Sequence, residues 1–216
     1  MSDIPAFVLA SQSPARLSVL RAAGIDPIVR VSGVDEDAVA ATLTDPTPEH
    51  TVIALAQAKA RAVVAQFSDG DVCLLDNALN CVVVGCDSML LLDGELQGKP
   101  ESVEVARQRW KAMAGRSGEL LTGHAVLRMD DGRIVADAAA CSATTVHFAS
   151  PSDAELDAYL ASGEPLRVAG AFTLDGLGGW FVDRIEGDPS SVIGIGLPLL
   201  RSLLDEVGVS VARLWG

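Results

Sequence analysis

A lone aspartate stands inside the most apolar stretch of the chain. The run CVVVGCDSMLLL covers residues 81–92, and Asp87 is its only charged residue. A carboxylate there is desolvated unless it pairs with a cation or binds a metal ion. The alternative is an aspartate that caps a turn at the end of a strand, but Met89 to Leu92 continue the apolar run beyond it. We therefore favour a functional role for Asp87, as a general base or a metal ligand.

The stretch VLASQSPARLSVL places a cation at the start of a predicted helix. Ser13 is a good N-cap and Pro14 suits the first helical position. Arg16 then falls in the first turn, where the helix dipole mildly disfavours positive charge. Either Arg16 is solvated, or an anion lies in front of it.

Two lysines are further candidates for binding an anion. In the predicted helix 47–67, Lys59 falls within the apolar stripe, so it either snorkels from the stripe's edge or meets an anion. Lys99 lies in GELQGKP, which is not a P-loop because its spacing is one residue short and Pro100 replaces the Ser or Thr that holds magnesium.

The acidic triplet Asp35-Glu36-Asp37 is predicted to follow a strand. Such clusters are usually solvated, although magnesium often uses only one or two protein carboxylates. One cleft holding Arg16, Lys59 and Lys99 with Asp87 and Glu36 would fit metal-assisted chemistry on a phosphate chain. Other phosphoesters remain alternatives from the residues alone.

Composition narrows the class of protein. The chain has 216 residues, 49% hydrophobic and 21% charged, with a net charge of −13. This excess of acid argues against nucleic acid or an anionic membrane as a partner, but not against a small anionic ligand. No signal peptide or membrane-spanning run is apparent, and the four cysteines have no metal-ligand spacing, so we expect a cytosolic protein with reduced thiols.

The residue pattern predicts an α/β fold with long antiparallel strands rather than a repeating βαβ unit. Strands are predicted at 6–10, 28–33, 81–92, 119–129, 133–148 and 180–185. Helices are predicted from the Ser13 cap to Gly24 and at 47–67, 102–114, 152–161 and 197–207. Residues 68–80 are expected to form a loop or a small insertion.

Seven segments in a fixed order resemble the Maf family. They read LASQSPARLSVLRAAGI, VDED, LAQAKARAV, VVGCDSMLLLDGELQGKP, MAGRSGELLTGHAVL, SDAELDAYLASGEPLRVAGAF and IEGDPSSVIGIGLPL, and the likeness runs from about residue 7 to residue 204. The resemblance implies an inosine-triphosphatase-like fold, a long mixed β-sheet with flanking helices in two lobes around a cleft, as one domain over residues 1–216. It also implies a homodimer.

The same resemblance implies a cytosolic nucleoside triphosphate pyrophosphatase that uses Mg²⁺ or Mn²⁺ and yields a nucleoside monophosphate and pyrophosphate. It implies removal of modified or non-canonical nucleotides and a link with septum formation and arrest of cell division. Asp87 would be the proton acceptor, and Glu36 and Asp87 would hold the metal. The residues implied to grip the triphosphate are Ser11, Arg16, Lys59 and Lys99, and the two lysines would also serve catalysis.

Three positions depart from the family pattern. Ala15 stands where the family usually has the first of two arginines, Ser88 where threonine is usual, and Asp175 where glutamine is usual. The preferred base therefore stays open. A nucleotide-binding regulator of division with little catalysis, and a phosphatase that releases inorganic phosphate, are the rival interpretations.

Overall fold

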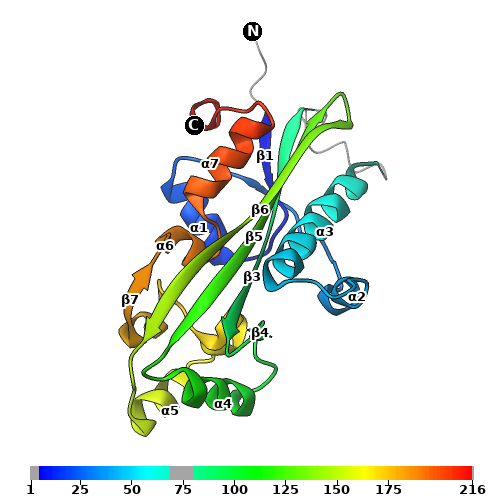
Figure 1. Ribbon diagram of the computed structural model, residues 1–216. Helices are drawn as coiled ribbons and strands as arrows, with labels where there is room; N and C mark the ends of the chain where they lie inside the picture. Colours follow the sequence, from blue (N-terminus) through cyan, green and yellow to red (C-terminus); the bar gives the residue numbers. More distant parts are fainter. Residues whose placement is uncertain (1–4, 69–79, 216) are drawn as a thin grey trace. The chain divides into compact units, whose positions relative to one another are not determined.

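The computed structural model describes residues 5–68 and 80–215 (Figure 1). Its helices are α1 Pro14–Ala22, α2 Glu36–Ala41, α3 Pro48–Ser68, α4 Val103–Met113, α5 Asp153–Ala161, α6 Pro189–Ile193 and α7 Leu197–Glu206. Its strands are β1 Ala6–Leu9, β2 Ile28–Val29, β3 Cys81–Leu92, β4 Glu95–Gln97, β5 Ser117–Asp130, β6 Arg133–Phe148 and β7 Val182–Glu186. Short 3₁₀ segments include η4, Leu177–Phe181.

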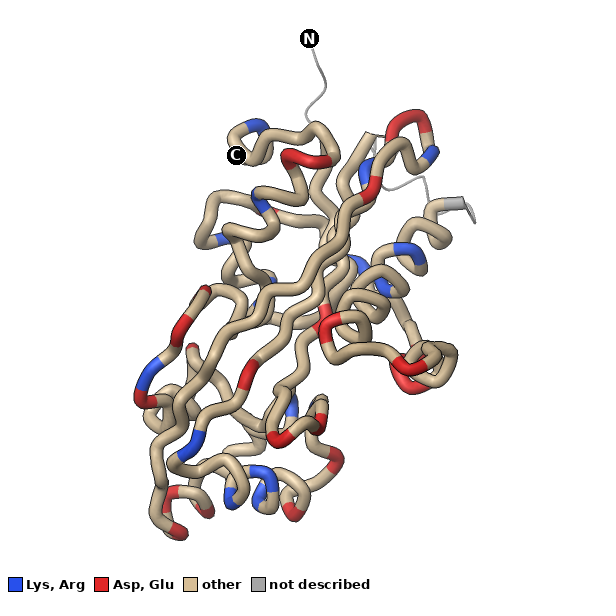
Figure 2. The backbone as a smooth tube through the Cα atoms, viewed as in Figure 1, with Lys and Arg blue, Asp and Glu red and all other residues tan. Residues whose placement is uncertain are grey.

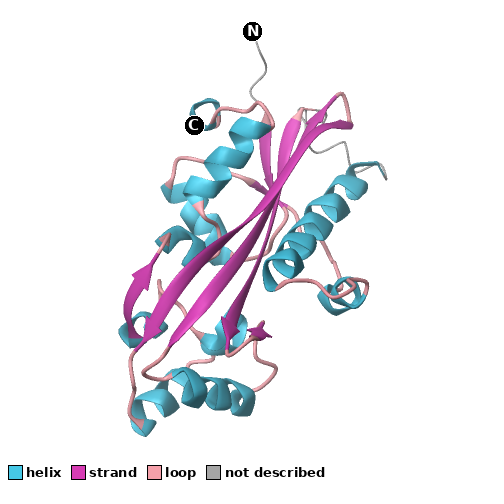
Figure 3. Cartoon of the chain, viewed as in Figure 1, coloured by secondary structure: helices cyan, strands magenta, loops and turns pink. Residues whose placement is uncertain are grey.

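The strands form one mixed sheet, and Figure 3 shows the helices beside it. The strand order is β2-β1-β3-β5-β6-β7, and β4 pairs with β3. Strand β1 pairs in parallel with β2 and with β3, where Val8 lies opposite Ile28 and Val83 respectively. The β3–β4 and β6–β7 pairs are antiparallel. The predicted α/β class and mixed sheet are confirmed.

The chain divides into two compact units. Unit 1 comprises residues 1–87, 123–141 and 197–216, and unit 2 comprises residues 88–122 and 142–196. Strands β3, β5 and β6 each contribute residues to both units. The single domain with two lobes, expected from the family resemblance, stays a prediction.

In unit 1, α3 covers one face of the strands. Its core-facing residues Ala56, Ala60 and Val63 are fully buried. They belong to a cluster with residues of β1, β3 and β5, among them Val8 and Val83. The alternate residues of β1 and β3 are buried as well, and Figure 1 shows α1 and α7 on the side away from α3. Helices on both faces explain why the residues before Asp87 in β3 are apolar on both faces of the strand.

Two glycines bring α3 close to the sheet. A Cβ at Gly85 would overlap the carbonyl oxygen of Ala56 and lie 3.0 Å from the amide nitrogen of Ala60. A Cβ at Gly123 of β5 would overlap the backbone of Val52. Only glycine lets the helix backbone approach the strands this closely.

The core of unit 2 centres on Trp110 of α4. Its ring makes edge contacts with Phe148, Tyr159 and Phe181, each with ring centroids 5.8 Å apart. The indole nitrogen donates a 2.7 Å hydrogen bond to the carbonyl oxygen of Ala171. Aromatic packing with a satisfied polar group makes Trp110 the anchor of this core.

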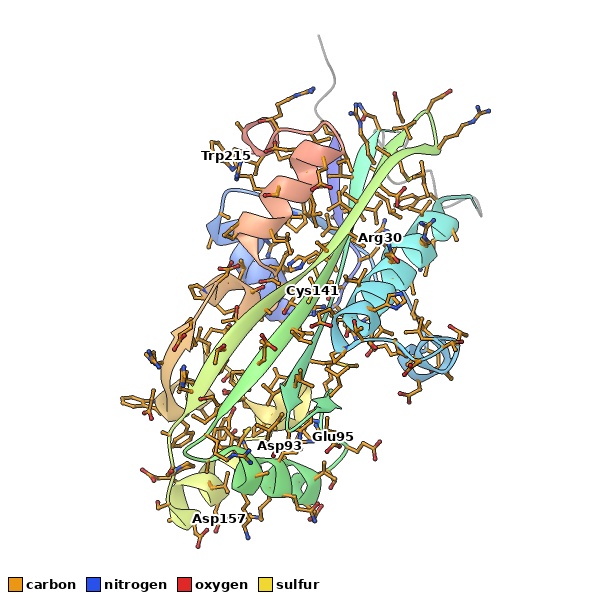
Figure 4. The ribbon with its side chains drawn as sticks, in the orientation of Figure 1. Arg30, Asp93, Glu95, Cys141, Asp157 and Trp215 are labelled. Atoms are coloured by element: carbon orange, nitrogen blue, oxygen red, sulfur yellow. The ribbon has the colours of Figure 1, made fainter. Side chains whose placement is uncertain are left out.

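The predicted cap of α1 is confirmed, and the structure shows two further local features. Ser13 caps α1, and Ser152 with Glu155 forms the capping box of α5. Asp93 and Gly94 make the tight turn between β3 and β4 with φ of 53° and 83°, and Figure 4 labels Asp93 and Glu95 there. The predicted loop lies almost wholly outside the described residues, as does Cys73.

Two predictions differ from the structure. The strand expected at 28–33 is only two residues long. The acidic triplet begins a helix, α2, which the sequence analysis did not predict. Asp35 caps it by accepting a hydrogen bond of 3.0 Å from the backbone nitrogen of Ala38. In the described ranges, no helix is long and apolar enough to cross a membrane.

Candidate functional site

Lys59 lies between two carboxylates in unit 1. Its Nζ is 2.6 Å from Asp87 Oδ1 and 2.7 Å from Glu36 Oε1. Lys59 and Asp87 are buried, with 8% and 5% of their surfaces exposed, whereas the Glu36 side chain is 44% exposed. Pairing within this network offsets part of the cost of burying Lys59 and Asp87.

The elements explain why these side chains meet. Gly85 and Asp87 are two residues apart in β3, so they point to the same face. Gly85 touches Ala56 and Ala60 of α3, the residues that flank Lys59 along the helix. The close approach at Gly85 therefore brings Lys59 over Asp87. Glu36 reaches the same lysine from the first position of α2.

The second carboxylate oxygen of Asp87, Oδ2, is available to accept a proton or bind a cation. Oδ2 is buried and has no hydrogen-bond partner within the part of the chain that the structure describes. A buried carboxylate oxygen without a donor is costly in a resting site, and it suits an atom that receives a proton or a cation.

The donor set fits a magnesium or manganese ion with few protein ligands. Among residues 5–68 and 80–215, no group of three or more His, Cys, Asp or Glu side chains could hold a metal. Asp87 and Glu36 supply two carboxylates around Lys59 Nζ, and Asp87 Oδ2 accepts no hydrogen bond from any residue that the structure describes. Mg²⁺ commonly binds through one or two carboxylates together with water and substrate phosphates.

Ser11 orients Arg16 in the same unit. Its Oγ accepts a hydrogen bond of 3.1 Å from Arg16 Nη1 and another of 3.2 Å from the backbone nitrogen of Ser13. The Ser13 hydroxyl in turn accepts from the backbone nitrogen of Arg16 at 3.4 Å. The N-terminus of α1 and the Arg16 guanidinium are thus held together, which is a suitable arrangement for an anion.

The pKa of the buried Cys86 thiol shows which charged side chains act on the region around Asp87. Burial raises the pKa of its thiol to about 11, the charges of Arg16 and Lys59 act to lower it, and that of Asp87 acts to raise it. Arg16 therefore acts on the same region as the Lys59–Asp87 pair. The raised pKa keeps Cys86 a neutral thiol, so it is no nucleophile at neutral pH.

Comparison with known proteins identifies the family. The model of the family described as "Maf-like protein" matches residues 6–207. A protein of Nocardia farcinica named nucleoside triphosphate pyrophosphatase is 72% identical, over 97% of this chain and 96% of its own length. Proteins of the same name from Rhodococcus jostii, at 69%, and Mycobacterium ulcerans, at 55%, also match over 97% of this chain and 95% and 96% of their own lengths respectively.

The chain belongs to the Maf family. In this Maf chain, unit 1 contains five of the six predicted site residues, which are Ser11, Arg16, Glu36, Lys59 and Asp87. The structure brings Glu36, Lys59 and Asp87 into direct contact and joins Ser11 to Arg16. The anions that it places beside Lys59 are carboxylates, so a contact between Lys59 and phosphate stays a prediction.

The sixth predicted residue of the Maf chain, Lys99, lies in unit 2, and its place in the site is untested. Lys99 is exposed, and the residue before it is hydrogen-bonded within unit 2. The carbonyl oxygen of Gly98 accepts hydrogen bonds from Arg109 Nη1 at 2.6 Å and from the backbone nitrogen of Gly170 at 3.2 Å. Lys99 thus follows a hydrogen-bonded glycine and has an exposed side chain.

Two hydroxyl groups that are not among the predicted site residues lie in contact. In unit 2, Ser88 Oγ lies 3.1 Å from Thr122 Oγ1, and Thr122 donates a 3.1 Å hydrogen bond to the carbonyl oxygen of Ser191. Nothing in the local pattern around Thr122 indicates this contact. The cap formed by Asp35 was detectable, because an Asp followed by two acidic residues is typical of a helix start.

Proposed function

We propose that this Maf-family chain hydrolyses a nucleoside triphosphate to a nucleoside monophosphate and pyrophosphate with the help of a divalent metal. The observation that carries the proposal is the buried Lys59–Asp87 pair, in which Asp87 Oδ2 has no hydrogen-bond partner among the described residues. The names of the relatives at 55–72% identity support the same reaction.

In the proposed reaction, a water oxygen attacks the α-phosphorus while the bond between that phosphorus and the bridging oxygen breaks. Pyrophosphate leaves, and the proton of the water passes to Asp87 Oδ2. Lys59 holds the other oxygen, Oδ1, and so fixes the orientation of the carboxylate. Positioning of this kind accounts for a large share of rate in phosphoryl transfer.

Other residues bind the charged groups. Asp87 and Glu36 would hold the metal ion, which when bound supplies positive charge to the phosphate oxygens. Arg16, oriented by Ser11, and the N-terminus of α1 would bind the phosphate chain, with Lys99 as a further cation. Because Ala15 stands where the family usually has a first arginine, Arg16 would have to neutralise more of the negative charge of the phosphate chain.

The test is pyrophosphate release from a panel of natural and modified triphosphates with Mg²⁺ or Mn²⁺, with both products identified. We expect pyrophosphate as product and a loss of at least about a hundredfold in kcat for Asp87→Asn. Asp205→Asn, which changes an exposed aspartate of α7, is the matched control. Wild-type turnover in Asp87→Asn would refute the assigned base, and release of inorganic phosphate alone would refute the reaction.

The biological context is proposed on the family resemblance alone. Removal of modified or non-canonical nucleotides would be the role of the activity, in the cytosol and in a homodimer. A preference for a modified over a standard triphosphate in the same panel would support that role.

A further inference from the structure

We propose that a second copy of this chain pairs with the outer edge of β7, in an antiparallel register centred on Ile185. The proposal specifies the surface of the homodimer and does not depend on the reaction assigned above. It rests on an open strand edge, on the order of charges along that strand and on an exposed tryptophan beside it.

Strand β7 has one open edge. It is the last strand in the sheet order, it pairs with β6, and no other described strand borders it. Its residues Asp183, Arg184 and Glu186 are exposed, whereas Ile185 packs partly against the core of unit 2. An open edge presents backbone donors and acceptors that another strand can complete.

The charges of β7 favour one self-pairing register. With Ile185 opposite its own copy, Arg184 of each chain lies opposite Glu186 of the other, which gives two cross-strand pairs of opposite charge. A shift of one residue places Asp183 opposite Glu186, and a shift of two residues places Arg184 opposite Arg184; like charges there are unfavourable. Figure 2 shows this alternation of basic and acidic positions along β7.

Arg184 and Glu186 are already oriented on one face of the sheet. They form an ion pair of 2.8 Å, and His147 of β6 lies 3.0 Å from Glu186 and 3.2 Å from Arg184. Side chains held in this way lose less conformational freedom on binding a second copy.

Apolar surface next to β7 supplies the area that a short strand lacks. Stable interfaces bury about 1,200–2,000 Å² in total, which is more than a five-residue edge provides. Trp180 is 84% exposed and Leu177 50% exposed, and both belong to η4, directly before β7. In the proposed register, η4 of one copy runs past the start of α6 in the other, where Pro189 is exposed.

A short, highly charged edge strand is also a device by which proteins prevent pairing, which predicts a monomer. Charge exchange separates the two explanations. Arg184→Glu makes both positions acidic and Glu186→Arg makes both basic, so each variant repels itself. A mixture of the two variants restores both opposite-charge pairs, as does the double variant alone.

The experiment is sedimentation velocity on the full chain over a wide range of concentrations. We expect a wild-type dimer, a dimer Kd raised more than about tenfold in each single variant, and recovery in the equimolar mixture and in the double variant. Arg201→Glu, which changes an exposed arginine of α7, is the charge-matched control and should dimerise like wild type. Trp180→Ser should weaken the dimer independently.

Three results would overturn the proposal. They are a wild-type monomer at all concentrations, single variants that dimerise as wild type does, and a mixture that stays monomeric. Circular dichroism verifies that each variant is folded. Pyrophosphate release is measured separately, so failure of the proposed reaction leaves the sedimentation result interpretable.

Discussion

At the scale of single residues, Lys59 lies on the buried face of α3 and pairs with the carboxylates of Asp87 and Glu36. A lysine that snorkelled to solvent would have left Asp87 unpaired in an apolar strand. Nζ instead contacts Asp87 and Glu36, and the Lys59 side chain is only 10% exposed. Removal of one partner from such a pair is costly, because the remaining charge stays buried.

We therefore predict that Lys59→Met lowers the free energy of unfolding by about 3–5 kcal/mol and abolishes turnover. The physical reason is the uncompensated charge on buried Asp87. Urea titration of Lys59→Met, Asp87→Asn and the double variant measures the coupling. The double variant should be more stable than Lys59→Met, and strict additivity of the two single effects would contradict the prediction.

The sequence was sufficient to single out these residues but not to pair them. Asp87 was identifiable because an aspartate interrupts an apolar run, and Lys59 because it falls within an apolar stripe. Their contact depends on Gly85, which by itself looks like any glycine in a strand. The helix at Glu36 was not predicted because its six residues show no apolar periodicity, although Asp35 and the two acidic residues after it are a signal of a helix start.

At the scale of elements, the distance between α3 and β3 controls the site. Gly85→Ala forces a methyl group into the carbonyl oxygen of Ala56, so α3 must move away and take Lys59 with it. We expect a loss of about 1–3 kcal/mol in stability and roughly a hundredfold loss in activity. Thermal unfolding and pyrophosphate release measure the two effects.

Gly98→Ala is the control for the stability effect, since a Cβ there meets only the Met89 side chain, at 3.9 Å. It should unfold close to wild type. Equal destabilisation of the two variants would attribute the effect to the general loss of a glycine rather than to the approach of α3.

The glycine-rich segment after Thr173 is held by the carboxylate of Glu164. Glu164 accepts hydrogen bonds from Thr173 Oγ1 at 2.5 Å and from the backbone nitrogens of Gly178 and Leu177 at 3.0 and 3.1 Å. Burial acts to raise the pKa of Glu164, but these hydrogen bonds outweigh it and lower the pKa. The carboxylate thus organises the glycine-rich segment that follows Thr173.

A lowered pKa in the folded state means that Glu164 contributes stability above the unfolded value, about 4.3, and loses it as pH falls through the folded value. We predict that Glu164→Gln is less stable than wild type from pH 7 to about 5, and that the difference shrinks below about 4.3. Urea unfolding across this range measures it. Glu206→Gln, at the exposed end of α7, is the control, and a difference independent of pH would contradict the role.

At the scale of the whole molecule, the chain carries an excess of acid yet is proposed to bind a polyanion. The net charge of −13 argues against nucleic acid as a bulk partner, but it gives no position for a local cation site. The long strands and the α/β class followed from local patterns. The order of strands and the division into two units did not, because they depend on contacts between residues far apart in sequence.

Substrate binding should therefore be visible as stabilisation of the whole fold. A triphosphate analogue that cannot be cleaved between its α- and β-phosphates, with Mg²⁺ and at about 100 times its Kd, should add about 2.7 kcal/mol to the free energy of unfolding. For a chain of this size that corresponds to a rise of about 5–10 °C in Tm.

Differential scanning fluorimetry measures this shift, with the matching nucleoside as the control that lacks phosphates. Because the proposed contacts from Arg16 and α1 are to phosphate, the nucleoside should shift Tm far less than the analogue does. Arg16→Ala should reduce the shift produced by the analogue. Equal shifts from nucleoside and analogue would mean that the phosphate chain is bound elsewhere or not at all.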